Sequence, residues 1–262
     1  MAYSEENTRK IKEEYDGIDA IYNRLKFDIA SFDSKLKNKK SHEYLLEGVS
    51  RRLGILARCI RNIFRIFPVE KKDLLSRDDL TDLAINLHAF VVNISGIIDN
   101  LGWVFVYEND LFGSPKEGKI DKNGVGLFNK KTQAHLGPDL NTYLKSDRMK
   151  TWYTEYSKNY RDALAHRIPL YVPPSALNKK EKEEYMLLEK QLWDYSSSET
   201  ISQHDQIRKK QSQLGQPCRL IMHSFGEKSK FIFFHPQVIA DFMTIEEIIN
   251  KFCDNFAWEP RQ

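Results

Sequence analysis

The chain has 262 residues, enough to bury the core of one large domain or of one domain with an elaboration. Hydrophobic residues make up 41% and charged residues 29%, a composition typical of a soluble globular protein. The net charge of +3 is too small to indicate a polyanion partner by itself, so any such site must come from local clustering. Three cysteines (Cys59, Cys218 and Cys253) are odd in number and far apart, which argues against a disulfide framework and suggests a reducing, cytoplasmic compartment.

No segment predicts a signal peptide or a membrane span. The first residues are strongly polar, and the most apolar segment, around 89–106, is interrupted by Asn93, Asp99 and Asn100. A buried helix explains this segment better than a transmembrane one. We therefore expect no membrane partner.

The first predicted element is a long helix within residues 1–40. Apolar side chains recur there at alternating steps of four and three, namely Ile11, Tyr15, Ile18, Tyr22, Leu25, Ile29, Phe32 and Leu36. The same seam would serve for packing within the chain's own bundle or for a coiled coil with another chain. Packing within the bundle is the preferred interpretation.

Residues 41–175 are predicted to form the helical core, and its first helix runs from about 42 to Pro68. A basic ridge of Arg51, Arg58, Arg61 and Arg65 follows one edge of this helix. Such a ridge can follow the phosphate backbone of RNA. The alternative is an ordinary solvated face, or ion pairs with a neighbouring acidic helix.

The next predicted helix begins near Ser76 and runs to about 107. Asn86, Asn93 and Asn100 repeat every seven residues, with Ala89 and Gly96 between them. Buried amides need hydrogen-bond partners, so this polar and small-residue stripe predicts close approach of another helix or the wall of a polar pocket. Asp99 and Asn100 are candidates to line a functional site.

A polar stretch with many glycines follows at 108–139 and predicts a long loop with short pieces of structure. Loops of this length in compact domains are usually functional or disordered, so this one is expected to be able to close over a substrate. Lys130 and Lys131 are its candidate RNA contacts. The glycine spacing fits neither a Walker A loop nor a dinucleotide fingerprint.

The last predicted core helix, about 147–168, carries the sequence Arg161-Asp162-Ala163-Leu164-Ala165-His166 near its end. Asn159, Asp162 and His166 share one flank, and Arg161 lies about 140° from His166 at 100° per residue. An arginine can stabilise charge on a phosphate, and a histidine can transfer a proton. Asp162, four residues before His166, is expected to orient the ring, although a plain surface pair at a helix end would have the same spacing.

This arginine-to-histidine spacing resembles the signature of the HEPN superfamily, the higher eukaryotes and prokaryotes nucleotide-binding domains. The resemblance covers about residues 43–170. It implies an all-α, up-and-down helical bundle that forms a homodimer and brings two motifs together. Many members are endoribonucleases of toxin–antitoxin or antiviral systems, which implies RNA as substrate and a regulatory or antitoxin protein as a possible partner.

Beyond the core, residues 176–216 predict a charged helical insertion, and residues 217–262 predict a β-hairpin followed by a helix packed on the core. Clustered cysteines or histidines of the kind that bind zinc are missing from the sequence, so no metal or cofactor is expected. Two functions follow from the sequence. The first is a metal-independent endoribonuclease that uses Arg161, Asp162 and His166, and the second is a non-catalytic nucleotide-binding, RNA-binding or scaffold subunit.

Overall fold

The computed structural model describes residues 3–194, 201–224 and 231–256, and these parts of the chain are mainly α-helical with one small antiparallel strand pair. The body contains α1 (Glu5–Asp33), α2 (Lys39–Glu43), the π-helical turn η1 (Tyr44–Ser50), α3 (Arg51–Ile66) and α4 (Arg77–Glu108). Two 3-10 turns, η2 (Pro115–Glu117) and η3 (Lys122–Gly124), precede the short helices α5 (Lys130–Gln133) and α6 (Pro138–Leu144).

The second half of the chain contains α7 (Asp147–Thr151), the π-helical turn η4 (Trp152–Ser157), α8 (Lys158–His166), α9 (Lys179–Asp194) and α10 (Ile201–Gln211). It ends with β1 (Leu220–Ile221), β2 (Ile232–Phe233) and α11 (Phe234–Asp254). Leu220 pairs with Phe233 and Ile221 with Ile232. The predicted hairpin and final helix are thus confirmed, with strands shorter than expected.

Side-chain caps fix where several helices begin. The hydroxyl of Ser4 accepts a hydrogen bond from the Asn7 backbone, and that of Ser76 accepts one from Asp79. Ser146 caps α7 in the same way. Each cap satisfies an amide that has no partner within its own helix, so these short polar residues determine the helix starts.

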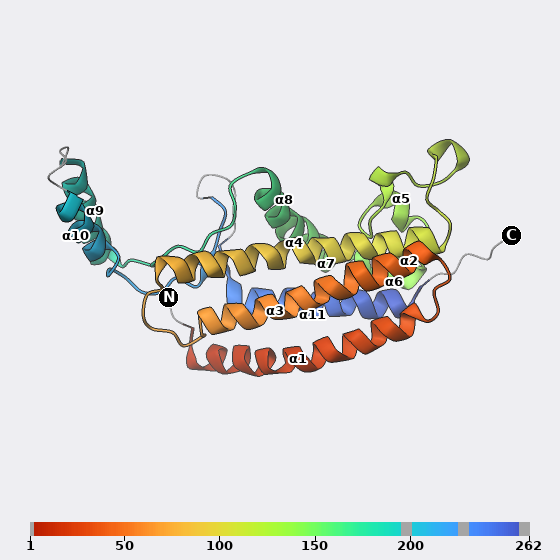
Figure 1. Cartoon of the computed structure of the whole chain (residues 1–262), viewed down its shortest axis with the longest axis horizontal. Helices are drawn as coiled ribbons and strands as arrows, with labels where there is room; N and C mark the ends of the chain where they lie inside the picture. Colours follow the sequence, from red (N-terminus) through yellow and green to blue (C-terminus); the bar gives the residue numbers. More distant parts are fainter. Residues whose placement is uncertain (1–2, 195–200, 225–230, 257–262) are drawn as a thin grey trace.

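Four helices, α1, α3, α4 and α11, lie side by side along the long axis of the molecule (Figure 1). Helices α3 and α4 are antiparallel, because Arg52 contacts Asn93 and Asn62 contacts Asn86. Helix α11 runs parallel to α1. The segment from α5 to α8 lies along α4, and α9 and α10 project from one end of the body.

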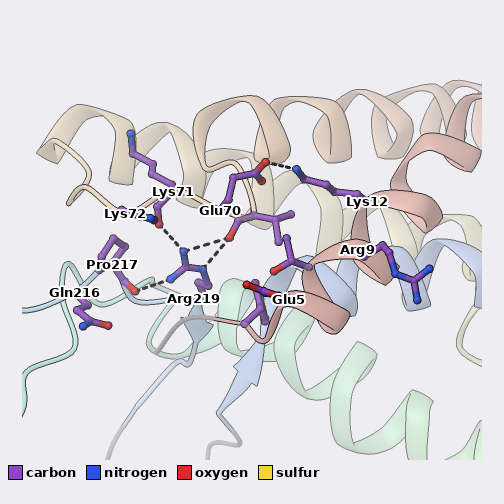
Figure 2. A pocket seen from close by; sticks show the side chains of 12 residues that line it. Glu5, Arg9, Lys12, Glu70, Lys71, Lys72, Gln216, Pro217 and Arg219 are labelled. Carbon is purple, nitrogen blue, oxygen red and sulfur yellow. Dashed lines mark hydrogen bonds and ion pairs between the residues drawn. The ribbon is translucent and has the colours of Figure 1, made fainter.

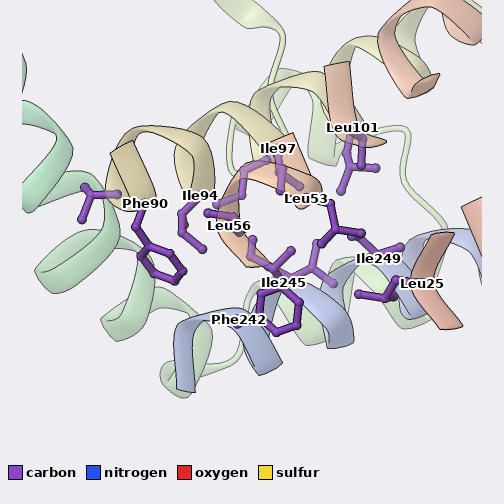
Figure 3. Packing of buried hydrophobic residues seen from close by; sticks show 14 of the residues in the cluster. Leu25, Leu53, Leu56, Phe90, Ile94, Ile97, Leu101, Phe242, Ile245 and Ile249 are labelled. Atoms are coloured by element: carbon purple, nitrogen blue, oxygen red, sulfur yellow. The ribbon is translucent and has the colours of Figure 1, made fainter. Parts of the chain in front are cut away.

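All four long helices contribute to one apolar core (Figure 3). Leu25 of α1, Leu53 of α3, Ile97 of α4 and Ile245 of α11 are at most 1% exposed. The heptad seam of α1 buries Ile11, Ile18, Leu25, Ile29 and Phe32 against this core. Packing within the chain is therefore confirmed as the role of these seam residues.

Two predicted helices are less regular than their apolar pattern indicates. The helix expected from about 42 contains the π-helical turn η1, and the helix expected over 147–168 is divided by η4 and ends at His166. A π-helical turn shifts the register of the side chains that follow it, and such turns are frequent at functional sites. Both turns here lie next to α4.

Helices α9 and α10 form a hairpin with a small core of its own, made of Leu188, Leu192 and Ile207. Both helices lie within the charged helical insertion predicted for residues 176–216. Helix α10 is strongly charged, and Ile207 is its buried residue in this small core.

Helix α4 is long and apolar enough to cross a membrane, and 67% of its most apolar window is buried inside the bundle. Core helices of soluble proteins have the same property, so the helix by itself is weak evidence for a membrane span. Its burial agrees with the core position expected from the sequence.

Candidate functional site

Arg161 is the centre of the candidate site. It lies on α8, its side chain is 36% exposed, and its Nη1 lies 3.1 Å from Oδ1 of Asp162, which is 33% exposed. Its Nε is buried and has no hydrogen-bond partner among the described residues. A buried donor of this kind is costly unless a further group accepts its proton. Arg161 therefore carries one buried donor that the described residues leave unsatisfied.

Asp99 of α4 lies within electrostatic reach of Arg161. The side chain is exposed, yet the protein around its carboxylate raises its pKa, while the guanidinium groups of Arg161 and Arg52 act to lower it. The sequence-based expectation that Asp99 lines the same site as Arg161 agrees with this geometry. The site thus contains two carboxylates: Asp162, which pairs with Arg161, and Asp99, which is influenced by two cations from different helices.

Arg52 is the functional candidate that sequence analysis missed. Its Nη1 donates a hydrogen bond of 3.0 Å to Oδ1 of Asn93, and its guanidinium lies over Gly96. A Cβ atom at Gly96 would lie 2.5 Å from Cζ of Arg52, so a larger residue there would displace the guanidinium from this position. The stripe of small and amide residues on α4 was the available signal, because it required a polar partner from a neighbouring helix.

Tyr153 belongs to the π-helical turn η4 and faces the same charges. Burial raises its pKa most, and Asp99 raises it further, whereas Arg161 lowers it. Its ring stacks on Phe128 with centroids 4.0 Å apart and an interplanar angle of 5°. Tyr153 therefore connects η4 to the long loop beside the site.

The long loop is fixed against α4 at this position. A Cβ atom on Gly102 would lie 2.7 Å from Cα of Gly126, so the two backbones are in direct contact. Gly126 has φ of 145°, a conformation that side chains rarely adopt. The hydroxyl of Thr132 also bridges the Gly124 carbonyl and the Gly126 amide. This part of the expected substrate-closing loop is an anchored wall of the site.

His166 ends α8 and is exposed. The prediction that Asp162 orients this ring is wrong for the single chain, because Asp162 pairs with Arg161 instead. The long arginine side chain folds back to the adjacent carboxylate, and its charge is permanent. Asn159 is not free to line the site either, since Arg167 donates hydrogen bonds to both its carbonyl and its Oδ1.

Asn100 faces away from its neighbour Asp99 and packs against Gly48 of η1. Its position is explained by helix packing, so the expectation that it lines the same site as Asp99 is not supported by its contacts. Gly48 has the same function as Gly96, because a Cβ atom there would lie 2.4 Å from the Asn100 amide nitrogen.

The predicted basic residues do not form one continuous surface. Arg51, Arg58 and Arg65 are exposed along α3, whereas Arg61 is turned toward α1 and pairs with Asp19 at 3.3 Å. Arg51 also pairs with Glu47. Lys130 and Lys131 are exposed on α5, where Lys131 pairs with Asp121 at 2.9 Å. Arg61 therefore contributes to helix packing.

A hollow near the start of the chain lies apart from the Arg161 site. It has a volume of about 760 Å³ and surrounds Arg219, which donates hydrogen bonds to the carbonyl oxygens of Val69, Lys71 and Pro217 (Figure 2). These bonds fasten the connection between α3 and α4 to the segment before β1. In Figure 2 the side chains of Lys71 and Arg9 extend outward from the rim. We interpret this region as structural.

His235 belongs to the same structural region. Burial lowers its pKa to about 4, so the ring is neutral at pH 7. Its Nε2 donates to the Phe67 carbonyl at 2.6 Å, and its Nδ1 accepts from the Tyr3 hydroxyl at 3.1 Å. A carbonyl can only accept a hydrogen bond, so Nε2 carries the proton and Nδ1 is the acceptor. These contacts connect α1, α3 and α11.

Within the described parts of the chain, no three His, Cys, Asp or Glu side chains are arranged to hold a metal ion. Cys59 lies in the apolar core, and burial raises its pKa to about 11. Comparison of the chain with profiles of protein families, with curated proteins and with solved structures finds no match.

Proposed function

We propose that the protein is a metal-independent endoribonuclease of the HEPN type. The observation that carries the proposal is the charge cluster of Arg161, Asp99 and Arg52 on one face of the bundle, with His166 exposed on the same helix as Arg161. The cluster supplies cations for a phosphate, and His166 supplies a group that can exchange a proton with a bound substrate.

The chemistry is attack by a ribose 2′-hydroxyl on the adjacent phosphorus. A base removes the hydroxyl proton, an acid protonates the leaving 5′-oxygen, and cations stabilise the negative charge of the transition state. His166 transfers a proton, while Arg161 and Arg52 stabilise the charge. Asp162 orients the guanidinium of Arg161 through their ion pair, and Asp99 adds a second carboxylate within electrostatic reach. The products are a 2′,3′-cyclic phosphate and a 5′-hydroxyl end.

The site is proposed to be completed in a homodimer. Two apolar side chains of α4, Ile85 and Val92, are 57% and 45% exposed, and Ile55 of α3 is 41% exposed. These residues share the outer side of α3 and α4 with Arg52, so a second copy covering them would approach the motif. Arg161 and His166 lie on different faces of α8, so one protomer supplies the arginine and its partner supplies the histidine of a shared site.

One observation favours the alternative of a non-catalytic nucleotide-binding, RNA-binding or scaffold subunit. Asp162 pairs with Arg161 rather than with His166, so the single chain holds no carboxylate-oriented histidine at the motif. A binding subunit needs only the cations. The two functions differ in whether substitution of His166 affects bond cleavage.

The test is cleavage of a labelled RNA in EDTA by the full chain and by the variants His166→Ala and Arg161→Ala. We expect each substitution to reduce the rate by about 10² to 10⁴, the usual contribution of a general acid or base or of a charge-stabilising group. His166→Ala should leave thermal stability unchanged, since the side chain is exposed.

Arg167→Ala is the matched control, because it removes a neighbouring cation that donates hydrogen bonds to Asn159. Light scattering of the same samples should give a dimer at micromolar concentration. If His166→Ala cleaves RNA as fast as the parent chain, or if a purified dimer cleaves no RNA, the proposal of a nuclease is rejected in favour of a binding subunit. A stable monomer would contradict the shared site.

A further inference from the structure

Four aromatic side chains form a cluster at the end of α4 that follows the candidate site. Tyr44 of η1, Trp103 and Tyr107 of α4 have ring centroids 5.3 to 5.6 Å apart and interplanar angles of 19° to 28°. Phe112 meets Trp103 nearly edge-on, with centroids 5.3 Å apart and an angle of 61°. Three nearly parallel rings of this kind present a flat apolar surface, which we call the aromatic platform.

The platform is at the surface of the molecule. Phe112 is 38% exposed, and Tyr44, Trp103 and Tyr107 are partly exposed. The aromatic cluster near the opposite face, Phe32, Phe252 and Phe256, is at most 8% exposed. The exposed ion pair of Lys40 and Glu43 borders the platform beside Tyr107. Ordinary core packing therefore does not account for rings that remain in contact with water.

The platform continues from the candidate site along α4. The segment formed by η1 and α3 runs antiparallel to α4 and contacts it at successive positions. Arg52 contacts Asn93, Gly48 contacts Asn100, and Tyr44 contacts Trp103. Asp99 and Trp103 are one helical turn apart, about 6 Å along the axis at 1.5 Å per residue. A strand bound with a phosphate at Arg161 and Arg52 would have its next bases near Trp103.

We propose that the aromatic platform binds unpaired bases of single-stranded RNA that enters the candidate site. This inference rests on the proposed function for its choice of RNA. Aromatic faces stack on any base, while neighbouring cations bind the backbone, and these are the two ingredients of single-strand recognition. The platform then makes the protein select unpaired RNA over duplex, because paired bases are already stacked on one another.

The experiment measures binding of a short, fluorescently labelled oligoadenylate to the full chain carrying His166→Ala, which separates binding from cleavage. In this background, Trp103→Ala and Phe112→Ala should each weaken binding by roughly 5- to 150-fold, the range for loss of base–aromatic stacking. Trp103→Phe should recover most of the affinity, since it keeps a ring. Circular dichroism of each variant establishes that the fold is retained, and Phe112 is the more exposed of the two positions.

Phe27→Ala is the matched control, because Phe27 is an aromatic residue of α1 that is 75% exposed and lies outside the platform. A duplex of the same length should bind more weakly and should be insensitive to Trp103→Ala. Equal losses for Phe27→Ala and Trp103→Ala, or a fully folded Phe112→Ala variant with unchanged affinity for the single strand, would overturn the inference. Capture of a protein segment in place of RNA would also overturn it.

The outcomes for this inference and for the proposed nuclease are distinguishable. Binding that depends on Trp103 without any cleavage by the parent chain would retain the platform and reject the nuclease. Cleavage that depends on His166 but whose rate and binding are unaffected by Trp103→Ala would retain the nuclease and reject the platform.

Discussion

The four-helix body and the motif segment, residues 147–166, are held in place by different forces. The body buries long apolar side chains on every facing surface of α1, α3, α4 and α11. The motif segment contributes Met149 and Tyr160 to the same apolar core. It also makes polar contacts with α11, because Trp152 donates a hydrogen bond of 2.7 Å to Asp241 and Arg148 pairs with Glu247. The body is thus fixed by many apolar contacts, whereas the motif segment combines a smaller apolar contact with a few specific polar ones.

The largest expected effect is in the body. Phe242 of α11 is fully buried at the centre of the core (Figure 3). Phe242→Ala should lower the free energy of unfolding by about 3–5 kcal/mol, because it removes buried surface and leaves a cavity. Urea denaturation followed by circular dichroism measures the change. Met243→Ala on the same helix is the control, since Met243 is 36% exposed. A loss below that of the control would show that the core adjusts to the cavity.

The body is also the part that the sequence predicts best. Apolar spacing alone identifies Ile18, Leu25, Ile29 and Phe32 as buried residues of α1, and the prolines and caps indicate where helices begin and end. These are local properties of the chain, repeated over many residues. An error at one position is corrected by its neighbours.

The site is only partly predictable for the opposite reason. Arg161 and Asp99 stand out as polar residues in motif or stripe positions, but Arg52 and Tyr153 join them through contacts between elements that the sequence does not order in space. The π-helical turns η1 and η4 rotate these side chains without a clear signal in composition. The Asp162–His166 pair was predicted from spacing alone, and a competing partner, Arg161, displaced it.

The second prediction concerns the polar contact that holds the motif segment. Burial raises the pKa of Asp241 to about 6 from its ordinary 3.8, and hydrogen bonds from Trp152 and Gln237 oppose this shift. A raised pKa means that the folded state holds its proton more tightly than the unfolded state. The contribution of Asp241 to stability is therefore present below about pH 4 and is lost as the pH rises through 6.

Asp241→Asn should remove this loss, because an amide oxygen still accepts both hydrogen bonds and carries no charge. The variant should match the parent near pH 4 and be more stable by about 2–3 kcal/mol above pH 7.

His235, whose pKa is lowered to about 4, acts in the opposite direction and destabilises the fold as the pH falls from 6.5. Without Asp241 to offset it, acid destabilisation should be steeper. Urea midpoints at several pH values test this, with the exposed Asp254→Asn as control. A constant difference at every pH would contradict the assignment.

The smallest expected effect is at the second polar contact of the motif segment. Arg148 and Glu247 are 64% and 45% exposed, so water and salt screen their attraction. A double-mutant cycle with Arg148→Ala and Glu247→Ala should give a coupling energy of about 0.2–1 kcal/mol that decreases in high salt. Glu247 also accepts a hydrogen bond of 2.7 Å from the Tyr143 hydroxyl, so Glu247→Ala alone should cost more than Arg148→Ala alone. If the coupling energy exceeds the pH-dependent contribution of Asp241 to stability, the Arg148–Glu247 pair is the stronger of the two polar contacts. Salt would then affect the stability contributed by the contacts of the motif segment more than pH does.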